Sequence, residues 1–166
     1  MKAAAPWGRR GARAASGRVG PLLVVTPLRA PPQVLGYTVV NDVTARRWQG
    51  KKGGGQWFRA KSFDTFLPCG PHLVPAALVP DPQNLTIRTL LNGDLVQNGH
   101  TGAMIFSVAR IIAFLSQGTT LLPGTLICTG TPAGVGYTRG RYLKSGDTVS
   151  ITIQGLGMLT NTVVDE

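Results

Sequence analysis

The sequence VLGYTVVND, residues 34–42, contains the clearest strand signal in this chain. Residues 34–41 are mostly apolar, β-branched or aromatic, which is typical of a buried strand. Asp42 ends the run. The sequence therefore predicts a buried strand over Val34–Asn41 that places one carboxylate at its carboxyl end, where loops often carry functional groups.

Further strands follow this one along the chain. Asn92-Gly93 lies between the β-prone runs Leu85–Leu91 and Leu95–Gln97, and this dipeptide favours a two-residue hairpin because both turn positions need positive φ. Val149–Ile153 and Leu159–Val164 predict a second hairpin at the end of the chain. We also expect a short helix over Val43–Gln49, a basic loop over Lys51–Gly55, and strands over Phe63–Leu67, His72–Val79 and Thr125–Thr129.

One long helix is predicted between Thr101, as its N-cap, and Gln117, with Gly118 following it. Its apolar positions recur at steps of one, three and four, as on one face of a 3.6-period helix, at Met104, Ile105, Val108, Ile111, Ile112 and Leu115. Many strands with one long helix give a β-rich α+β domain.

Composition sets the outer limits. The chain has 166 residues, 43% hydrophobic and 14% charged, which fits one domain with an extension. No apolar run approaches the 18 or so residues of a membrane-spanning helix, so we expect no membrane partner. Cys69 and Cys128 are far apart in sequence and form no Cys-x-x-Cys pair, so neither a disulfide scaffold nor a zinc site is indicated. Cys128, within an apolar run, is expected to be buried.

The positive charge is concentrated at the amino-terminal end. The net charge is +10, and residues 1–33 contain six basic residues and no acidic one. This range is rich in Ala, Gly, Arg and Pro, a composition typical of a mitochondrial targeting peptide. The alternatives are a disordered extension in a cytoplasmic protein and an unrelated segment joined to a truncated domain. We therefore expect a leader over residues 1–33 and a folded domain over 34–166.

Five polar side chains occupy positions where ligand sites are usually built: Asp42, Arg46, Gln49, Lys61 and Thr131. Together they could hold a small anion and one hard cation. Each also has an ordinary structural interpretation. Asp42 could cap the helix from Val43, Arg46 and Lys61 could be solvated, and the Gly-rich segment around Thr131 could be only a tight connection.

A nucleic-acid interface is the other interpretation of the region from Arg46 to Lys61. It contains six basic residues, with Trp48, Trp57 and Phe58 among them. Such a mixture is found on surfaces that bind single strands. The simpler interpretation places these aromatic side chains in the core.

The motifs GYTVVNDVTAR (36–46), AKSFD (60–64), MIF (104–106) and LICTGTPAGVG (126–136) resemble the fumarylacetoacetate hydrolase family in order and spacing. The resemblance, closest to a mitochondrial branch, extends from Val34 to the carboxyl terminus. It implies a β-roll of mixed sheets, incomplete at its amino-terminal side, and homodimers. It also implies Mg²⁺, with Mn²⁺ or Ca²⁺ as substitutes, bound to a 2-keto acid. The implied activity is oxaloacetate keto-enol tautomerisation, with relatives that are hydrolases or decarboxylases.

The resemblance assigns a role to each candidate residue. Asp42 matches the metal-binding aspartate and Lys61 matches the catalytic lysine. Arg46, Gln49 and Thr131 match the residues that hold the substrate's carboxylate and keto oxygens. Mg²⁺ prefers oxygen ligands and stabilises an enolate as a Lewis acid, and a lysine ammonium adds to that stabilisation.

The chain departs from the family pattern in its acidic residues. The family's metal site also uses a Glu-x-Glu pair on a strand upstream of Val34, and its hydrolases use an upstream His-Glu dyad. The only glutamate here is Glu166, and both histidines, His72 and His100, follow Asp42. We therefore expect impaired or absent catalysis, and as an alternative a non-catalytic chain that dimerises with a full-length copy.

Overall fold

A computed structural model describes residues 15–16, 19–26 and 33–165. The strands are β1 (Ala15–Ser16), β2 (Val19–Thr26), β3 (Gln33–Asn41), β4 (Thr44–Ala45), β5 (Cys69–Pro75), β6 (Thr86–Leu91), β7 (Asp94–His100), β8 (Thr125–Cys128), β9 (Thr148–Ile153) and β10 (Gly157–Thr162). The α-helices are α1 (Arg46–Gln49), α2 (Trp57–Lys61), α3 (Val108–Leu115) and α4 (Gly136–Arg139). Short 3₁₀ helices are η3 (Lys51–Gly53), η4 (Ala76–Leu78) and η5 (Thr101–Ala103).

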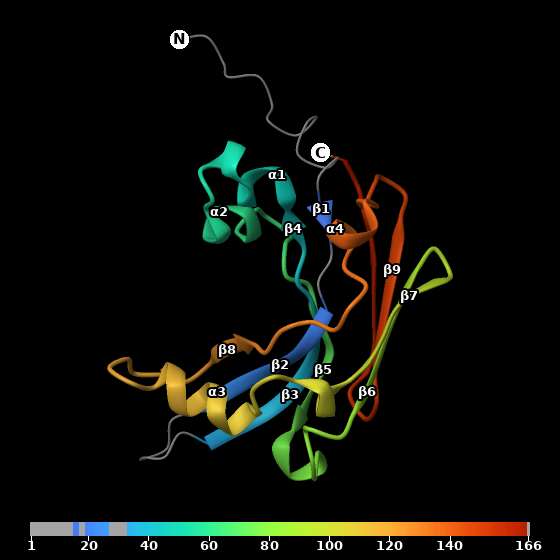
Figure 1. The fold of residues 1–166 in the computed structure, drawn as a ribbon. Coiled ribbons are helices and arrows are strands. Elements are labelled where there is room, and N and C mark those ends of the chain that lie inside the picture. The colour runs from blue at the N-terminus through green and yellow to red at the C-terminus, as the bar shows by residue number, and fades with distance from the viewer. Residues whose placement is uncertain (1–14, 17–18, 27–32, 166) are drawn as a thin grey trace.

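Two four-stranded sheets form the body of the described chain (Figure 1), with strand orders β5-β3-β2-β8 and β10-β9-β6-β7. A small β1-β4 pair lies beside α4. The β-rich α+β class is confirmed. The described sheets are antiparallel throughout rather than mixed. Parallel neighbours need a crossover that returns the chain to the same end of the sheet, and no described pair of neighbouring strands is joined in that way.

The hydrophobic core joins the two sheets and α3. It includes Tyr37 and Val39 of β3, Ile151 of β9 and Ile112 of α3. Val39 and Ile151 are fully buried, and each such side chain contributes about 1.5–3 kcal/mol to folding. Residues 37–41 of β3 are all buried because β2 and β5 flank the strand and β9 and β10 contact it. This explains why the run from Val34 is almost continuously apolar.

Strand β2 changes the predicted domain boundary. Val19–Thr26 pairs with β3, starting at Val19 opposite Asn41, and with β8. These residues belong to the sheet, so the prediction of a leader over residues 1–33 is wrong for them. The physical reason is that the short apolar run Leu22–Val25 is long enough for a strand when neighbours pair with it on both sides. The predicted leader over 1–14 lies outside the described residues.

The predicted helix over 101–117 is wrong in its length, because the α-helix covers only Val108–Leu115. Ser107 is the N-cap, and its side chain accepts a hydrogen bond from Arg110 N at 3.2 Å. The Thr101 hydroxyl instead accepts a hydrogen bond from Leu85 N at 2.8 Å, so it anchors the chain ahead of β6. The buried face is correspondingly narrower: Val108 and Ile112 are buried, whereas Ile105 lies outside the helix and is 91% exposed. No described helix has the length and apolar character needed to span a membrane.

Of the other elements predicted from the sequence, most are present and some differ. The two hairpins form at β6–β7 and β9–β10, and the strands predicted from Val34 and Thr125 correspond to β3 and β8. The strand predicted over His72–Val79 is right only in its first half, because β5 covers Cys69–Pro75 and Ala76–Leu78 forms η4. The predicted strand over Phe63–Leu67 is wrong: it contains turns, with positive φ at Thr65 and Leu67. The short helix predicted from Val43 begins at Arg46.

The β6–β7 turn is fastened to β9 by Asn92. This residue and Gly93 have φ of 53° and 87°, as the hairpin required. The Asn92 side chain donates to Asp147 Oδ1 and accepts from Thr148 N, both at 2.8 Å. The turn therefore has two requirements at one position, a positive φ and a hydrogen-bonding side chain.

Replacing Asn92 separates these requirements. Asn92→Gly keeps the positive φ and loses both hydrogen bonds, and should lower the free energy of unfolding by about 1–2 kcal/mol. Asn92→Ala also strains the turn and should cost about 1 kcal/mol more. Chemical denaturation measures both. Equal stability of Asn92→Gly and the original chain would contradict the role of the side chain.

Candidate functional site

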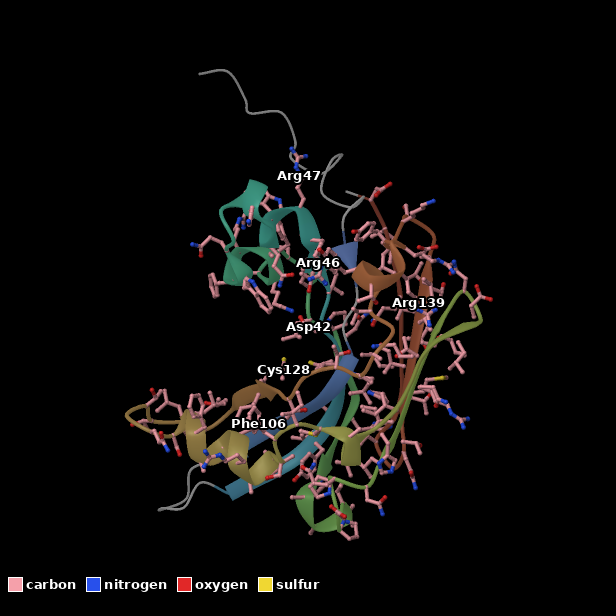
Figure 2. All side chains as sticks on the ribbon, viewed as in Figure 1. Asp42, Arg46, Arg47, Phe106, Cys128 and Arg139 are labelled. Atoms are coloured by element: carbon pink, nitrogen blue, oxygen red, sulfur yellow. The ribbon has the colours of Figure 1, made fainter. Side chains whose placement is uncertain are left out.

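The site begins at the turn that ends β3. Val43 N donates to Asn41 O at 2.8 Å, which closes a tight turn centred on Asp42. The backbone of Asn41 is held in turn by Pro68 O, at 3.0 Å. The Thr44 hydroxyl donates to Asp42 O at 3.3 Å. Asp42 is thus fixed at the edge of the sheet where β3 gives way to α1 (Figure 2).

Helix α2 brings Lys61 to the same place. Ala60 is fully buried and anchors the helix. The Arg59 guanidinium lies over the rings of Phe63 and Trp48, at 4.4 Å and 5.5 Å from their centroids. This stacking joins α2 to α1, and Lys61 ends α2 with its side chain directed to the turn after β3.

Lys61 and Asp42 form an ion pair. The Lys61 ammonium donates to both oxygens of the Asp42 carboxylate, and to Thr44 Oγ1 at 3.1 Å. The two side chains are 26% and 21% exposed, so the pair can be reached by a small ligand. The site therefore presents an ammonium and a carboxylate side by side, which can supply and accept a proton at neighbouring positions of a ligand.

Arg46 and Gln49 form a second pair on α1. Arg46 Nη1 donates to Gln49 Oε1. The Arg46 guanidinium also lies over the ring of Tyr137, at 5.1 Å from its centroid. Gln49 is buried, and because its oxygen faces Arg46, its amide nitrogen points away from that residue. That nitrogen has no hydrogen-bond partner in residues 15–16, 19–26 and 33–165, so a ligand oxygen there would remove a cost of about 1–3 kcal/mol.

Thr131 lies on a separate segment, in the loop between β8 and α4. Its hydroxyl accepts a hydrogen bond from Gln97 Nε2 at 3.0 Å, and it lines a cavity of about 520 Å³ together with His100 and Phe106. The same loop continues to Tyr137, which contacts Arg46. The structure thus brings Asp42 to Lys61 and Arg46 to Gln49. Thr131 is bonded to Gln97, and its loop continues to Tyr137, whose ring lies against the Arg46 guanidinium.

These contacts decide several alternatives. The capping role for Asp42 is wrong, because α1 begins at Arg46 and Ala45 is its N-cap. Lys61 and Arg46 are half-buried and bonded rather than solvated. The expectation that the aromatic residues are core is wrong for Trp57 and Phe58, which are 56% and 82% exposed.

The side chains at Asp42 do not match the ligand set of a resident Mg²⁺ ion. Mg²⁺ needs octahedral oxygen coordination, usually with carboxylates supplying the charge. No group of three or more His, Cys, Asp or Glu residues in the described ranges could hold a metal. Strand β2 pairs with β3 beside Asp42 and has no acidic residue in its sequence. Both oxygens of Asp42 already accept hydrogen bonds from Lys61.

Sequence reasoning missed Thr44, Gln97 and Tyr137. Thr44 had a weak signal, because it follows Asp42 by two residues and has a hydroxyl. Gln97 is a buried amide on an otherwise alternating strand, and Tyr137 reaches Arg46 only through the fold. No local pattern distinguishes either from an ordinary polar or aromatic residue.

A comparison with known protein families identifies the family of this chain. The family described as fumarylacetoacetate (FAA) hydrolase C-terminal matches residues 15–164. The chain belongs to the fumarylacetoacetate hydrolase family. The match includes β2, in agreement with its place in the sheet.

Relatives within the fumarylacetoacetate hydrolase family support the assignment. The chain is 50% identical over 137 residues to "Oxaloacetate tautomerase fahd2, mitochondrial" from Xenopus laevis, covering 81% of this chain and 43% of that protein. The fumarylacetoacetate hydrolase of Exiguobacterium antarcticum has a TM-score of 0.88 at 36% identity, covering 97% of this chain and 61% of that one.

A fumarylpyruvate hydrolase from Pseudomonas aeruginosa, solved in complex with Mn²⁺ and pyruvate, has a TM-score of 0.81 at 31% identity, covering 92% of this chain and 66% of that one. The chain spans about half the length of the curated relatives it matches.

The pKa of the Cys128 thiol depends on the charges of the site. It is exposed, contrary to the expectation of a buried residue. Partial burial of the thiol raises its pKa, the Asp42 carboxylate raises it further, and the Lys61 ammonium lowers it. Cys128 therefore lies within electrostatic range of the ion pair (Figure 2).

We expect Asp42→Asn to lower the pKa of Cys128, because it removes a negative charge that disfavours the thiolate. Lys61→Met should raise that pKa, because it removes a positive charge that favours the thiolate. The measurement is the pH dependence of iodoacetamide alkylation in a Cys69→Ser background. Asp64→Asn is the control and should leave the pH dependence of alkylation unchanged, because Asp64 is not among the charges that shift the pKa of Cys128. Shifts in the same direction for the two site variants would contradict the ion-pair geometry.

Proposed function

We propose that this chain binds small 2-keto dicarboxylates, with oxaloacetate as the first candidate, and that it catalyses their keto-enol tautomerisation weakly. The observation that carries the proposal is that two bonded pairs, Asp42–Lys61 and Arg46–Gln49, are formed by residues that directly follow β3 and by the last residue of α2. The name of the Xenopus laevis relative supports oxaloacetate as the substrate.

The charges suit a dianion. Arg46 supplies a guanidinium for a carboxylate, and the buried Gln49 amide supplies a donor for a neighbouring oxygen. Lys61 places an ammonium where negative charge develops on the keto oxygen as the enolate forms. Thr131 contributes a hydroxyl from the β8–α4 loop.

Tautomerisation moves one proton from C3 of oxaloacetate to the oxygen on C2. In the proposed mechanism Asp42 accepts the C3 proton and Lys61 donates a proton to the oxygen, so atoms and charge balance once Asp42 returns its proton to Lys61. The ion pair places the two groups in contact, which suits such an exchange.

A divalent metal contributes little to the proposed tautomerisation. The Mn²⁺ complex of the Pseudomonas aeruginosa hydrolase shows that one related structure holds such a metal. When bound in a site of this type, a divalent cation supplies Lewis-acid stabilisation of an enolate. With one carboxylate at this site, already paired with Lys61, we propose that turnover here is slow and does not depend on Mg²⁺, Mn²⁺ or Ca²⁺.

A non-catalytic role is the second candidate. The chain spans about half of the curated relatives' length, and upstream of Glu166 it contains no glutamate. The absence of an internal glutamate suits a chain that forms a homodimer, or that dimerises with a full-length copy, and contributes binding residues only. The relative's printed name supports a mitochondrial location for either role.

Calorimetry with oxaloacetate in the presence of a chelator tests binding. We expect a single site that is weakened about 10- to 100-fold by Arg46→Met or Lys61→Met, the range set by one charged hydrogen bond. Arg141→Met and Lys144→Met are the matched controls, because both residues lie outside the site and are exposed. Binding that requires Mg²⁺, or that survives both site variants, would contradict the proposal.

The decay of enol absorbance measures catalysis. We expect a small acceleration over the uncatalysed rate, insensitive to chelator and abolished by Asp42→Asn. Binding without any acceleration would favour the non-catalytic role. Acceleration that disappears with chelator would restore the metal-dependent mechanism.

A further inference from the structure

Gln97 is a buried polar residue on β7 that belongs to neither pair at the end of β3. It is 3% exposed and lies opposite Thr89 of β6 in the strand register. Its amide reaches out of the sheet to the loop between β8 and α4, residues 129–135, here named the Thr131 loop. A buried amide with this many directed contacts has a specific structural purpose.

Both the nitrogen and the oxygen of the Gln97 amide make hydrogen bonds. Its nitrogen donates to Thr131 Oγ1 and to Pro132 O, each at 3.0 Å, and lies 3.5 Å from Ala133 O. Its oxygen accepts a hydrogen bond from the Thr89 hydroxyl at 2.9 Å. One side chain thus joins strand β6 to three consecutive residues of the Thr131 loop.

The orientation of the amide follows from its partners. Pro132 O and Ala133 O are carbonyl oxygens that can only accept, so the nitrogen must face the loop. The oxygen then faces Thr89, whose hydroxyl donates to it. Rotating the amide by 180° would set oxygen against oxygen at Pro132, and the Thr89 bond opposes that rotation.

Two close backbone approaches hold the loop on the same strand. A Cβ at Gly99 would lie 2.5 Å from Pro132 Cβ, and one at Gly134 would lie 2.0 Å from Val96 O. Both glycines are therefore required for the loop to lie directly on β7. Gln97 is between these two contacts and adds the polar attachment.

We propose that Gln97 is a positioning residue that sets the place of Thr131 relative to β7. The inference rests on the proposed function, in which Thr131 contributes to ligand binding. The Thr131 hydroxyl accepts from Gln97 Nε2 at 3.0 Å and itself donates to Pro132 O at 3.5 Å, so Gln97 fixes where this hydroxyl lies on the loop.

A double-mutant cycle tests the inference. Gln97→Met keeps the length of the side chain and removes its hydrogen bonds, and Thr131→Val removes the hydroxyl. We expect each to weaken oxaloacetate binding about 3- to 10-fold, and the double variant to be no weaker than the poorer single variant, because both act through one hydroxyl. Multiplied effects, or a Gln97→Met variant that binds as well as the original chain, would overturn the proposal.

Hydrogen exchange provides a readout that does not need a ligand. Gln97→Met should increase amide exchange in the Thr131 loop while leaving β9 and β10 protected. Gln83→Met is the matched control. Gln83 makes comparable bonds, accepting from Val108 N at 2.8 Å and donating to Thr101 O at 3.3 Å, yet it has no bond to the loop. We expect it to change stability without changing loop exchange or affinity.

The outcomes separate the two proposals. Faster loop exchange without oxaloacetate binding by the original chain would sink the proposed function and leave Gln97 as the residue that positions the loop. Unchanged loop exchange would overturn the positioning role. If Gln97→Met does not fold, Thr89→Val removes only the bond that orients the amide and should produce a smaller change in the same direction.

Discussion

The contact between Asp42 and Lys61 joins two parts of the chain that lie 19 residues apart in sequence. Neither side chain depends on their mutual attraction for its position, because other contacts hold each of them. Asp42 is held by the turn at the end of β3, and Lys61 by the buried Ala60 and the stacked Arg59. The sheet and α2 thus position two opposite charges whose value lies in ligand chemistry rather than in stability.

Within the part of the chain that the structure describes, the site has side chains suited to an organic dianion and no group of acidic or histidine residues suited to a metal. Arg46, Gln49, Lys61 and Thr131 offer donors, and Asp42 offers one carboxylate. The strand paired with β3 beside Asp42 has no acidic residue. An ammonium in contact with both oxygens of Asp42 supplies a single positive charge where a divalent ion would supply two. This difference is the physical reason for expecting ligand binding with weak catalysis.

Local sequence signals were sufficient for features that depend on neighbouring residues. The hairpin at Asn92-Gly93 and the strand ending at Asp42 followed from turn chemistry and hydrophobic patterning. Features that depend on tertiary pairing were missed. Strand β2 forms because β3 and β8 pair with it on both sides. Helix α3 begins after Ser107 rather than at Thr101, because the Thr101 hydroxyl is bonded to Leu85 N. The bond from Gln97 to the Thr131 loop joins residues that are far apart in sequence. For the candidate site, the sequence placed Asp42, Arg46 and Gln49 near the end of β3, but no local pattern indicated that Lys61 would pair with Asp42.

In the proposed site the Lys61 ammonium occupies the charge position at Asp42 that a divalent cation would otherwise hold. Titration with Mn²⁺, followed by electron paramagnetic resonance, tests it directly. We expect only weak binding, in the range of about a millimolar dissociation constant or weaker, with the Asp42→Asn variant indistinguishable from the original chain. Tight Mn²⁺ binding that is lost in Asp42→Asn would contradict it.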